Sequence, residues 1–154
     1  MNEDERVVVK LPSRSENVAL ARVIVVAFAS RLDFTVPEAE EISVAVSEAV
    51  SNCIIHGYRN GPGLVKLEMA VVGGALEVVV ADRGCGIPDV KQARQPAFTT
   101  VEERMGLGFV FMESFMDAMT VASRPGRGTR VVMRKRPERE AAKSALSEQC
   151  LPDQ

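Results

Sequence analysis

The segment over residues 47–57 constrains the fold of this chain more than any other stretch. Glu48, Asn52 and His56 recur at every fourth position, so on a helix they share one face. The positions between them are mostly small or branched apolar residues, and Gly57 is a typical helix end. A carboxylate and an amide on such an apolar helix are costly without partners. The segment therefore predicts a buried helix whose polar stripe either makes interior hydrogen bonds or holds a ligand.

The composition is that of an ordinary globular domain. The chain has 154 residues, of which 46% are hydrophobic and 26% charged, enough for one core. A net charge of −2 gives no support to nucleic-acid binding. No apolar run is long enough to span a membrane, and no signal peptide is recognisable. Three cysteines without metal-type spacing suit a reducing compartment, so we expect a cytoplasmic protein with no membrane or direct nucleic-acid contact.

Hydrophobic periodicity predicts both strands and helices. We expect strands over residues 7–11, 64–72, 76–81, 119–123 and 129–135, and helices over 16–32, 36–56 and 109–116. Thr35 and Pro37 mark the start of the second helix, and the Gly73-Gly74 pair predicts a hairpin. The nearly continuous apolar run over residues 76–81 favours a central strand. Short turns between strands imply an α/β fold, a two-layer sandwich with a mixed, mostly antiparallel sheet covered on one face by helices.

Two regions are set apart from this pattern. Residues 89–104 are polar and lack clean periodicity, which predicts a flexible lid with a short helix. Residues 137–154 are dominated by charge, which predicts a flexible tail that is either frayed or a short helix. The domain organisation predicted is one folded unit over residues 1–136 followed by this tail.

A carboxylate and two glycines follow the predicted central strand. Asp82, Gly84 and Gly86 form a loop in which glycine permits positive φ and close backbone approach to a ligand. Asp82 is suited to accept a hydrogen bond from an exocyclic amine such as that of adenine. The alternative is an ordinary Asp-Gly turn.

A second glycine pair precedes a predicted helix. Residues Gly106, Leu107, Gly108 and Phe109 are expected to open the helix over residues 109–116. Backbone N–H groups at a helix N-terminus bind phosphate through unpaired donors and the helix dipole. The spacing matches neither a Rossmann fingerprint nor a P-loop.

The remaining candidate residues each have two interpretations. Glu48 and Asn52 suit a metal–phosphate site, with an amide oxygen for Mg²⁺ and a carboxylate to deprotonate a hydroxyl, or they are interior hydrogen bonders. Arg104 either neutralises a terminal phosphate or is a solvated charge. Thr129 either reaches a base or simply favours a strand. For His56, a structural place at a helix end is favoured over catalysis.

The order and spacing of these motifs carry more information than any one of them. Together they resemble the N, G1, G2 and G3 boxes of the GHKL ATPase and kinase superfamily. The runs over residues 47–58 and 93–100 resemble the bacterial anti-sigma factor serine kinases, in particular those of sporulating bacteria. The resemblance covers residues 7–136, and it implies the superfamily's α/β sandwich with an ATP lid.

The resemblance also implies roles for individual residues. Glu48 matches the general base and Asn52 the Mg²⁺ ligand, and Asp82 matches the adenine-binding aspartate, with Gly84 and Gly86 closing its loop. The phosphates of ATP would be held by the second glycine segment. That segment comprises Gly106, Leu107, Gly108 and Phe109, with Arg104 near the γ-phosphate and Thr129 near the adenine.

The function implied is that of an ATP-dependent serine kinase. Such proteins form homodimers, hold a sporulation sigma factor inactive, and use Mg-ATP to phosphorylate a serine of an anti-anti-sigma antagonist; Arg22 falls where their first helix meets partners. A general stress-response anti-sigma kinase and a non-catalytic, ATP-gated sigma-sequestering module remain as alternatives. His56 is the only histidine and lies inside the ATP motif, which argues against an autophosphorylating histidine kinase.

Overall fold

The computed structural model describes the backbone of residues 5–95 and 101–149, and the side chains of residues 5–95 and 106–147. The expected strands are confirmed to within two residues at each end. The elements are β1 (Val7–Pro12), α1 (Glu16–Ala29), α2 (Val36–Asn52), β2 (Leu64–Val72), β3 (Ala75–Asp82), α3 (Val90–Ala93), α4 (Val101–Phe115), β4 (Ala118–Arg124), β5 (Gly128–Lys135) and α5 (Glu138–Gln149). A π-helical turn over Cys53–Gly57 continues α2.

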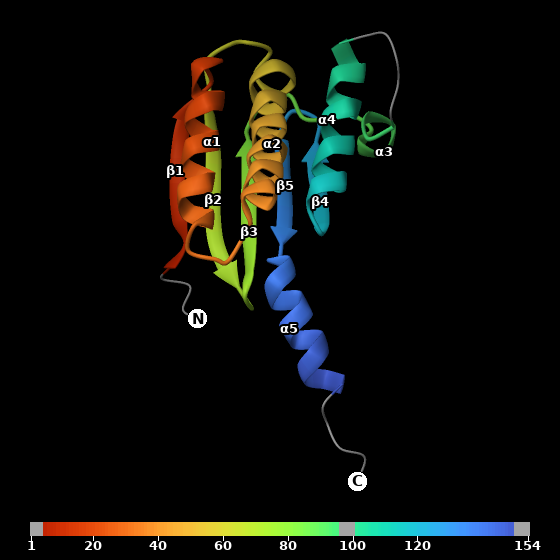
Figure 1. Ribbon diagram of the computed structural model, residues 1–154. Helices are drawn as coiled ribbons and strands as arrows, with labels where there is room; N and C mark the ends of the chain where they lie inside the picture. Colours follow the sequence, from red (N-terminus) through yellow and green to blue (C-terminus); the bar gives the residue numbers. More distant parts are fainter. Residues whose placement is uncertain (1–4, 96–100, 150–154) are drawn as a thin grey trace.

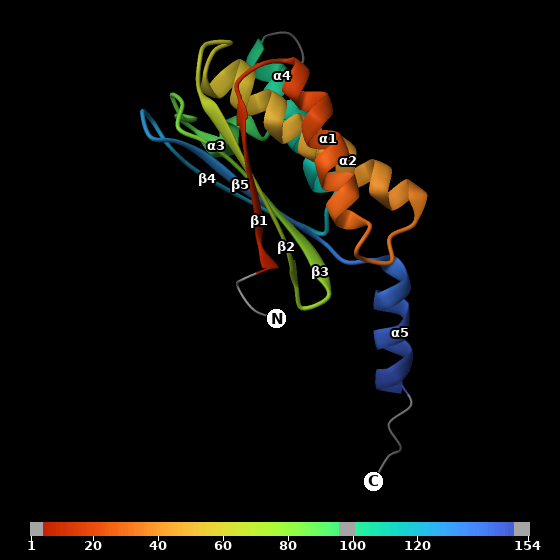
Figure 2. The ribbon, with the colours of Figure 1, turned by 90° about the vertical axis from the view of Figure 1, so that its left-hand side faces the viewer.

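The five strands form one sheet in the order β1-β2-β3-β5-β4. Each of the four pairings is antiparallel. β3 lies at the centre, as its continuous apolar sequence predicted. Helices α1, α2 and α4 cover one face and leave the other open, which confirms the two-layer α/β sandwich (Figures 1 and 2).

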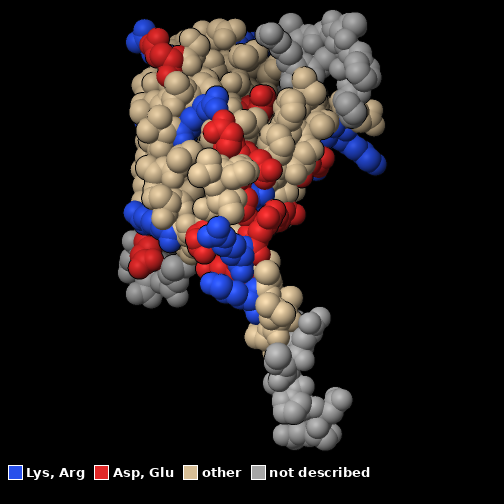
Figure 3. Space-filling model, viewed as in Figure 1, with Lys and Arg blue, Asp and Glu red and all other residues tan. Residues whose placement is uncertain are grey.

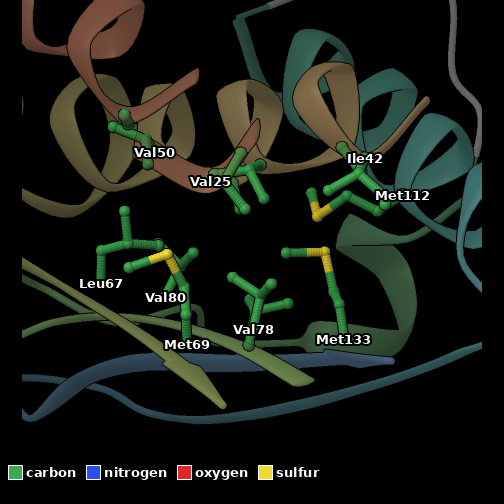
Figure 4. Packing of buried hydrophobic residues seen from close by; sticks show 14 of the residues in the cluster. Val25, Ile42, Val50, Leu67, Met69, Val78, Val80, Met112 and Met133 are labelled. Carbon is green, nitrogen blue, oxygen red and sulfur yellow. The ribbon is translucent and has the colours of Figure 1, made fainter. Parts of the chain in front are cut away.

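The helical layer carries both charged and apolar residues outside and is apolar inside. Seen from the helix side, lysines, arginines and carboxylates are interspersed over its surface (Figure 3). On its inner side, Val25 and Ile42 point toward Leu67, Val78 and Met133 of the sheet (Figure 4), and all five are fully buried. The sheet residues alternate and the helix residues recur every three or four positions, so each element contributes one apolar side to the core.

The start of α2 follows the sequence prediction. The Thr35 hydroxyl accepts a hydrogen bond from the Glu38 backbone, and the Glu38 carboxylate accepts one from the Thr35 backbone at 2.7 Å. Pro37 lies in the first turn, where its missing N–H has no cost. This reciprocal capping box satisfies two of the unpaired N–H groups at the helix start.

The start of α4 differs from the prediction. The helix was expected to open at the glycine pair, but it begins at Val101, so Gly106 and Gly108 lie inside it. Glycine is a poor helix former, yet here it lets α4 approach its neighbours where a larger residue would collide. Tertiary packing overrides the local preference, and the prediction of an N-terminal glycine pair was wrong for this conformation.

The charged tail forms a helix, one of the two expected alternatives. α5 projects away from the two-layer body (Figures 1 and 2). Its first turn is held by Glu38, whose Oε1 accepts a hydrogen bond from the Glu138 backbone at 2.8 Å. Within the described residues, the helices are too short or too polar to cross a membrane.

Glu38 therefore caps two helices with one buried side chain. It is only 2% exposed and lies between the start of α2 and the start of α5. Burial by itself would raise the pKa of Glu38, but hydrogen bonds from Thr35 and Glu138 outweigh it and hold the pKa below its usual range. The carboxylate thus contributes stability at neutral pH, and this contribution is lost as the pH falls through the lowered pKa.

We expect Glu38→Ala to lower the free energy of unfolding by about 1–3 kcal/mol, because it leaves buried N–H groups at two helix starts unpaired. The measurement is urea unfolding at neutral pH, with amide exchange in α5 as a local readout. Glu40→Ala, on the exposed side of the same helix, should change stability by no more than about 0.5 kcal/mol. Equal losses in both variants would contradict the dual-cap role.

Candidate functional site

The site is organised by a close approach between the end of α2 and the end of β3. The π-helical turn brings Gly57 against Asp82, and a Cβ on this glycine would lie 2.9 Å from both carboxylate oxygens. π-helical turns are rare and are found mostly at functional sites. Only a residue without a side chain allows this contact, so Gly57 does more than end a helix.

Three more glycines allow close backbone packing in the same region. A Cβ on Gly84 would overlap the carbonyl of Gly57, and a Cβ on Gly128 would overlap the carbonyl of Asp82. Gly86 has a φ of +73° and packs against the carbonyl of Arg124. The loop after β3 is thus wedged between the end of α2 and the turn that joins β4 to β5.

Asp82 is a buried carboxylate without a cationic partner among the described residues. Its Oδ1 accepts a hydrogen bond from Gly84 at 2.8 Å, so the Asp-Gly turn considered as an alternative is also present. Burial raises the pKa of Asp82 above its usual range. Hydrogen bonds from the backbone of Gly84 and Thr129 and from the thiol of Cys53 offset part of that effect. The carboxylate is therefore held in place by donors.

Glu48 and Asn52 meet the second glycine segment from the opposite side. A Cβ on Gly108 would lie 3.0 Å from Glu48 Oε2 and 3.5 Å from Asn52 Nδ2. Glycine at this position lets α4 lie directly on the polar stripe of α2. The N-box and G2-box motifs, separated by more than fifty residues in sequence, are thus in contact.

The polar stripe is not fully satisfied by the protein. Asn52 Nδ2 is buried and has no hydrogen-bond partner among the described residues. Burial raises the pKa of Glu48, and among the described residues no cation offsets this rise. An unpaired buried amide and a carboxyl of raised pKa are typical of a binding or catalytic site rather than of a structural core.

A small cavity of about 20 Å³ lies between Asn52 and Asp82, and Glu48 does not line it. Five of the predicted site residues line it, namely Asn52, Asp82, Gly86, Phe109 and Thr129. Its volume admits about one water molecule, whereas pockets for nucleotide-sized ligands span roughly 300–1,000 Å³. The cavity is therefore closed to a larger ligand in the described conformation, and opening it requires α4 to move.

Other predicted residues lie elsewhere or outside the described part. Leu107 is 51% exposed, on the outer side of α4, and Gly106 packs against the carbonyl of Gln95. The side chain of Arg104 lies outside the described residues. No group of three or more histidine, cysteine, aspartate or glutamate side chains that could hold a metal occurs in the described part of the chain.

Sequence analysis missed several residues that hold the site together. The Ser123 hydroxyl accepts from the Ile87 backbone at 2.7 Å, donates to the Gly128 carbonyl at 3.0 Å and lies 2.8 Å from the Thr129 hydroxyl. A serine in an edge strand gives no local signal of this role. Only the pairing of β4 with β5, which places Ser123 opposite Thr129, reveals it.

Tyr58 is the second missed residue. Its hydroxyl donates to the Leu64 carbonyl at 2.6 Å and accepts from the Arg83 backbone at 2.9 Å. It therefore connects the turn after α2 to the start of β2 and to the loop after Asp82. The one signal in the sequence was that Tyr58, the only tyrosine of the chain, directly follows Gly57.

We expect Ser123→Ala to lower the free energy of unfolding by about 1–3 kcal/mol, because the buried N–H of Ile87 loses its acceptor. Amide exchange at Ile87 should accelerate as well. Ser114→Ala is the matched control, since this serine is exposed on α4 and should change stability by no more than about 0.5 kcal/mol. Unchanged exchange at Ile87 would rule out the bracing role of Ser123.

Comparison with known proteins agrees with this geometry. The family model of the histidine kinase-like ATPase domain matches residues 11–135. An anti-sigma F factor of Thermoanaerobacter pseudethanolicus is 49% identical over 125 residues, which are 80% of this chain and 87% of that protein. An anti-sigma F factor of Clostridium kluyveri is 45% identical over 134 residues, 86% of this chain and 94% of that protein.

Solved structures share the fold. The RsbU and RsbW domains of Rv1364c from Mycobacterium tuberculosis align with a TM-score of 0.62 at 18% identity, covering 85% of this chain and 32% of that one. A blue-light activated histidine kinase from Erythrobacter litoralis aligns with a TM-score of 0.54 at 26% identity, covering 71% and 34%. With the family model and the relatives, the chain belongs to the anti-sigma F factor family and carries a histidine kinase-like ATPase domain.

Proposed function

We propose that this protein is an anti-sigma factor and an ATP-dependent protein serine kinase. It binds and inhibits a sporulation sigma factor, and it phosphorylates a serine of the anti-anti-sigma antagonist. The observation that carries the proposal is the contact of Gly108 with Glu48 and Asn52, next to the cavity lined by Asp82 and Thr129. The contact joins a candidate base and a candidate metal ligand to a glycine segment.

The residues at the site fit Mg-ATP. Asn52 has a buried amide nitrogen without a partner among the described residues, and its carbonyl oxygen is a hard ligand of the kind that Mg²⁺ takes in nucleotide sites. When bound, Mg-ATP supplies the phosphoryl group and cationic neutralisation of its charge. Asn52 is the residue that we assign to Mg²⁺, and the segment from Gly106 to Phe109, with Arg104, is assigned to the phosphates.

We assign Asp82 to the adenine end of the nucleotide. Its carboxylate is held by three donors and still faces the cavity, where an exocyclic amine would find an acceptor. Thr129 lies on the same cavity wall, while Gly84 and Gly86 shape the loop. The desolvation that raises the pKa of Asp82 also strengthens a hydrogen bond made there, because buried polar groups interact at lower dielectric.

Glu48 is assigned as the general base. It lies one helical turn before Asn52, and burial raises its pKa toward the range in which a carboxylate accepts a proton effectively. Its role is to take the proton of the substrate serine hydroxyl. The rate should therefore rise with pH through the raised pKa of Glu48, because only the deprotonated form acts.

The partners are proposed from the family and from the surface of α1. Relatives are named anti-sigma F factors, and we extend sigma F binding to this chain. We also propose a homodimer. α1 leaves Leu20, Val23 and Val26 exposed beside Arg22, so this helix offers apolar area for protein contacts.

The deciding experiment combines the protein with γ-labelled ATP, Mg²⁺ and the anti-anti-sigma protein of the same organism. We expect label on a serine of that protein, and a loss of about 10²- to 10⁴-fold in rate for Glu48→Gln. The acid limb of the pH–rate profile should also disappear in this variant. Glu140→Gln, a carboxylate on α5, is the matched control and should retain the parental rate.

The outcomes separate the alternatives. Near-parental rates in Glu48→Gln would refute the base assignment. Bound ATP without label on the antagonist would indicate a nucleotide-gated sequestering module instead of a kinase. Absence of ATP binding would overturn the proposed nucleotide site altogether.

A second test addresses the base of the nucleotide. Asp82→Asn replaces an acceptor oxygen by an N–H₂ donor, so the dissociation constant for ATP should rise at least about tenfold, or about 1.4 kcal/mol. Asp33→Asn, at an exposed carboxylate, should bind as the parent does. Calorimetric titration measures both, and equal affinities in the two variants would reject the assignment of Asp82.

A further inference from the structure

The open face of the sheet carries two kinds of cationic residue. In its middle, the cations are neutralised: Arg6 pairs with Glu68 at 3.2 Å and with Glu77 at 3.1 Å, and Arg134 pairs with Glu77 at 2.6 Å. These pairs cover Val79, which is fully buried although it points away from the helices. In the middle of the face, carboxylates of the protein itself therefore neutralise the cations.

At the end of the same face nearest the loop after Asp82, cations outnumber the carboxylates that line the same hollows, Glu68 and Asp82. We call this region the basic groove; it comprises Lys10, Lys66, Arg83, Arg124, Arg127 and Arg130. Of these, Lys66 forms an ion pair with Glu68, and the other five have none within the described part of the chain. The groove is therefore strongly positive on a molecule whose net charge is −2.

Strand register explains how the groove is built. Lys10 lies opposite Lys66, Lys66 opposite Ala81, and Ala81 opposite Arg130, which lies opposite Ala122. The row therefore crosses all five strands at one level, on the side away from the helices (Figure 2). Because Ala81 and Ala122 have short side chains, the surface of the sheet is low between the long cationic side chains. Two adjoining shallow hollows result, of about 600 and 480 Å³.

The arrangement is unfavourable for folding alone. Like charges directly opposite each other on neighbouring strands destabilise a sheet. The Lys10–Lys66 pair is such a contact, and of these two lysines only Lys66 forms an ion pair within the described residues, with Glu68. An external anionic group lying across the strands would remove the repulsion.

We propose that the basic groove is a docking site for an acidic segment of a partner protein. The groove offers guanidinium and ammonium groups along a line across the strands, which complements a run of carboxylates. This surface lies on the side of the sheet away from the helices, and Asp82 and Thr129 line its hollows as well as the small cavity. The docking proposal does not depend on the proposed kinase activity.

Other occupants fit less well. Single-stranded nucleic acid is held by stacking on aromatic side chains, but Tyr58 is the only aromatic residue that lines either hollow. Its hydroxyl is already engaged, and its ring packs against Gly63. A second copy docked face to face would bring cations against cations.

The test uses a fluorescein-labelled oligoglutamate peptide and fluorescence anisotropy at low and at physiological salt. The parent protein should bind the peptide, more weakly as salt screens the charges. Lys10→Glu/Arg130→Glu should weaken binding at least about tenfold, as expected when two partly exposed charge contacts are reversed. Arg31→Glu/Lys143→Glu makes the same change in net charge away from the groove and should bind within about twofold of the parent.

Arg124→Gln/Arg127→Gln provides a second variant at two exposed positions, the end of β4 and the turn that follows it. It should also weaken binding while thermal unfolding stays parental. The proposal is overturned if the parent does not bind the peptide at low salt, or if the groove and control variants lose affinity equally. It is also overturned if an oligothymidylate of equal charge binds the groove more tightly than the peptide, since the surface would then be a nucleic-acid site.

Discussion

The carboxylate of Asp82 lies where three backbone segments meet without side chains between them. Gly57 from the end of α2, Gly84 from the following loop and Gly128 from the start of β5 each approach to distances that a Cβ would forbid. This packing fixes the end of the central strand relative to the polar stripe of α2. The cavity, the loop after β3 and the turn between β4 and β5 all depend on it. A larger residue at any of these glycines would separate the elements that carry the site.

The polar stripe of α2 shows how stability and function divide one helix. Its early carboxylate, Glu38, is satisfied on all sides and fastens two helix starts together. Further along the helix, Glu48 has a raised pKa, and Asn52 has a buried amide nitrogen without a partner among the described residues. Unsatisfied polar groups in a native interior cost stability, so they persist where a ligand completes them. The position of each residue along the helix, rather than its type, separates the two roles.

Helix α4 in this conformation closes the candidate site. It packs Gly108 on Glu48 and Asn52 and leaves a cavity about the size of one water molecule. Two glycines within a helix lower its intrinsic stability, by roughly 1 kcal/mol each relative to alanine. Rearranging the start of α4 therefore costs little free energy. This explains how a closed site can occur in a family whose domain binds ATP. The same glycines permit the close packing and weaken the helix that makes it.

Local patterns determined the strands, the start of α2 and the central place of β3, because apolar period and turn chemistry act over a few neighbouring positions. The sequence did not reveal where α4 begins, since contacts with α2 outweigh the weak helix preference of glycine. Nor did it reveal Ser123, Tyr58 or the row of cations across the sheet, because these depend on register between strands distant in sequence. The sequence by itself determines the chemistry and the spacing of the residues. The tertiary structure decides which partners those residues contact, because the contacts form only when the sheet packs against its helices.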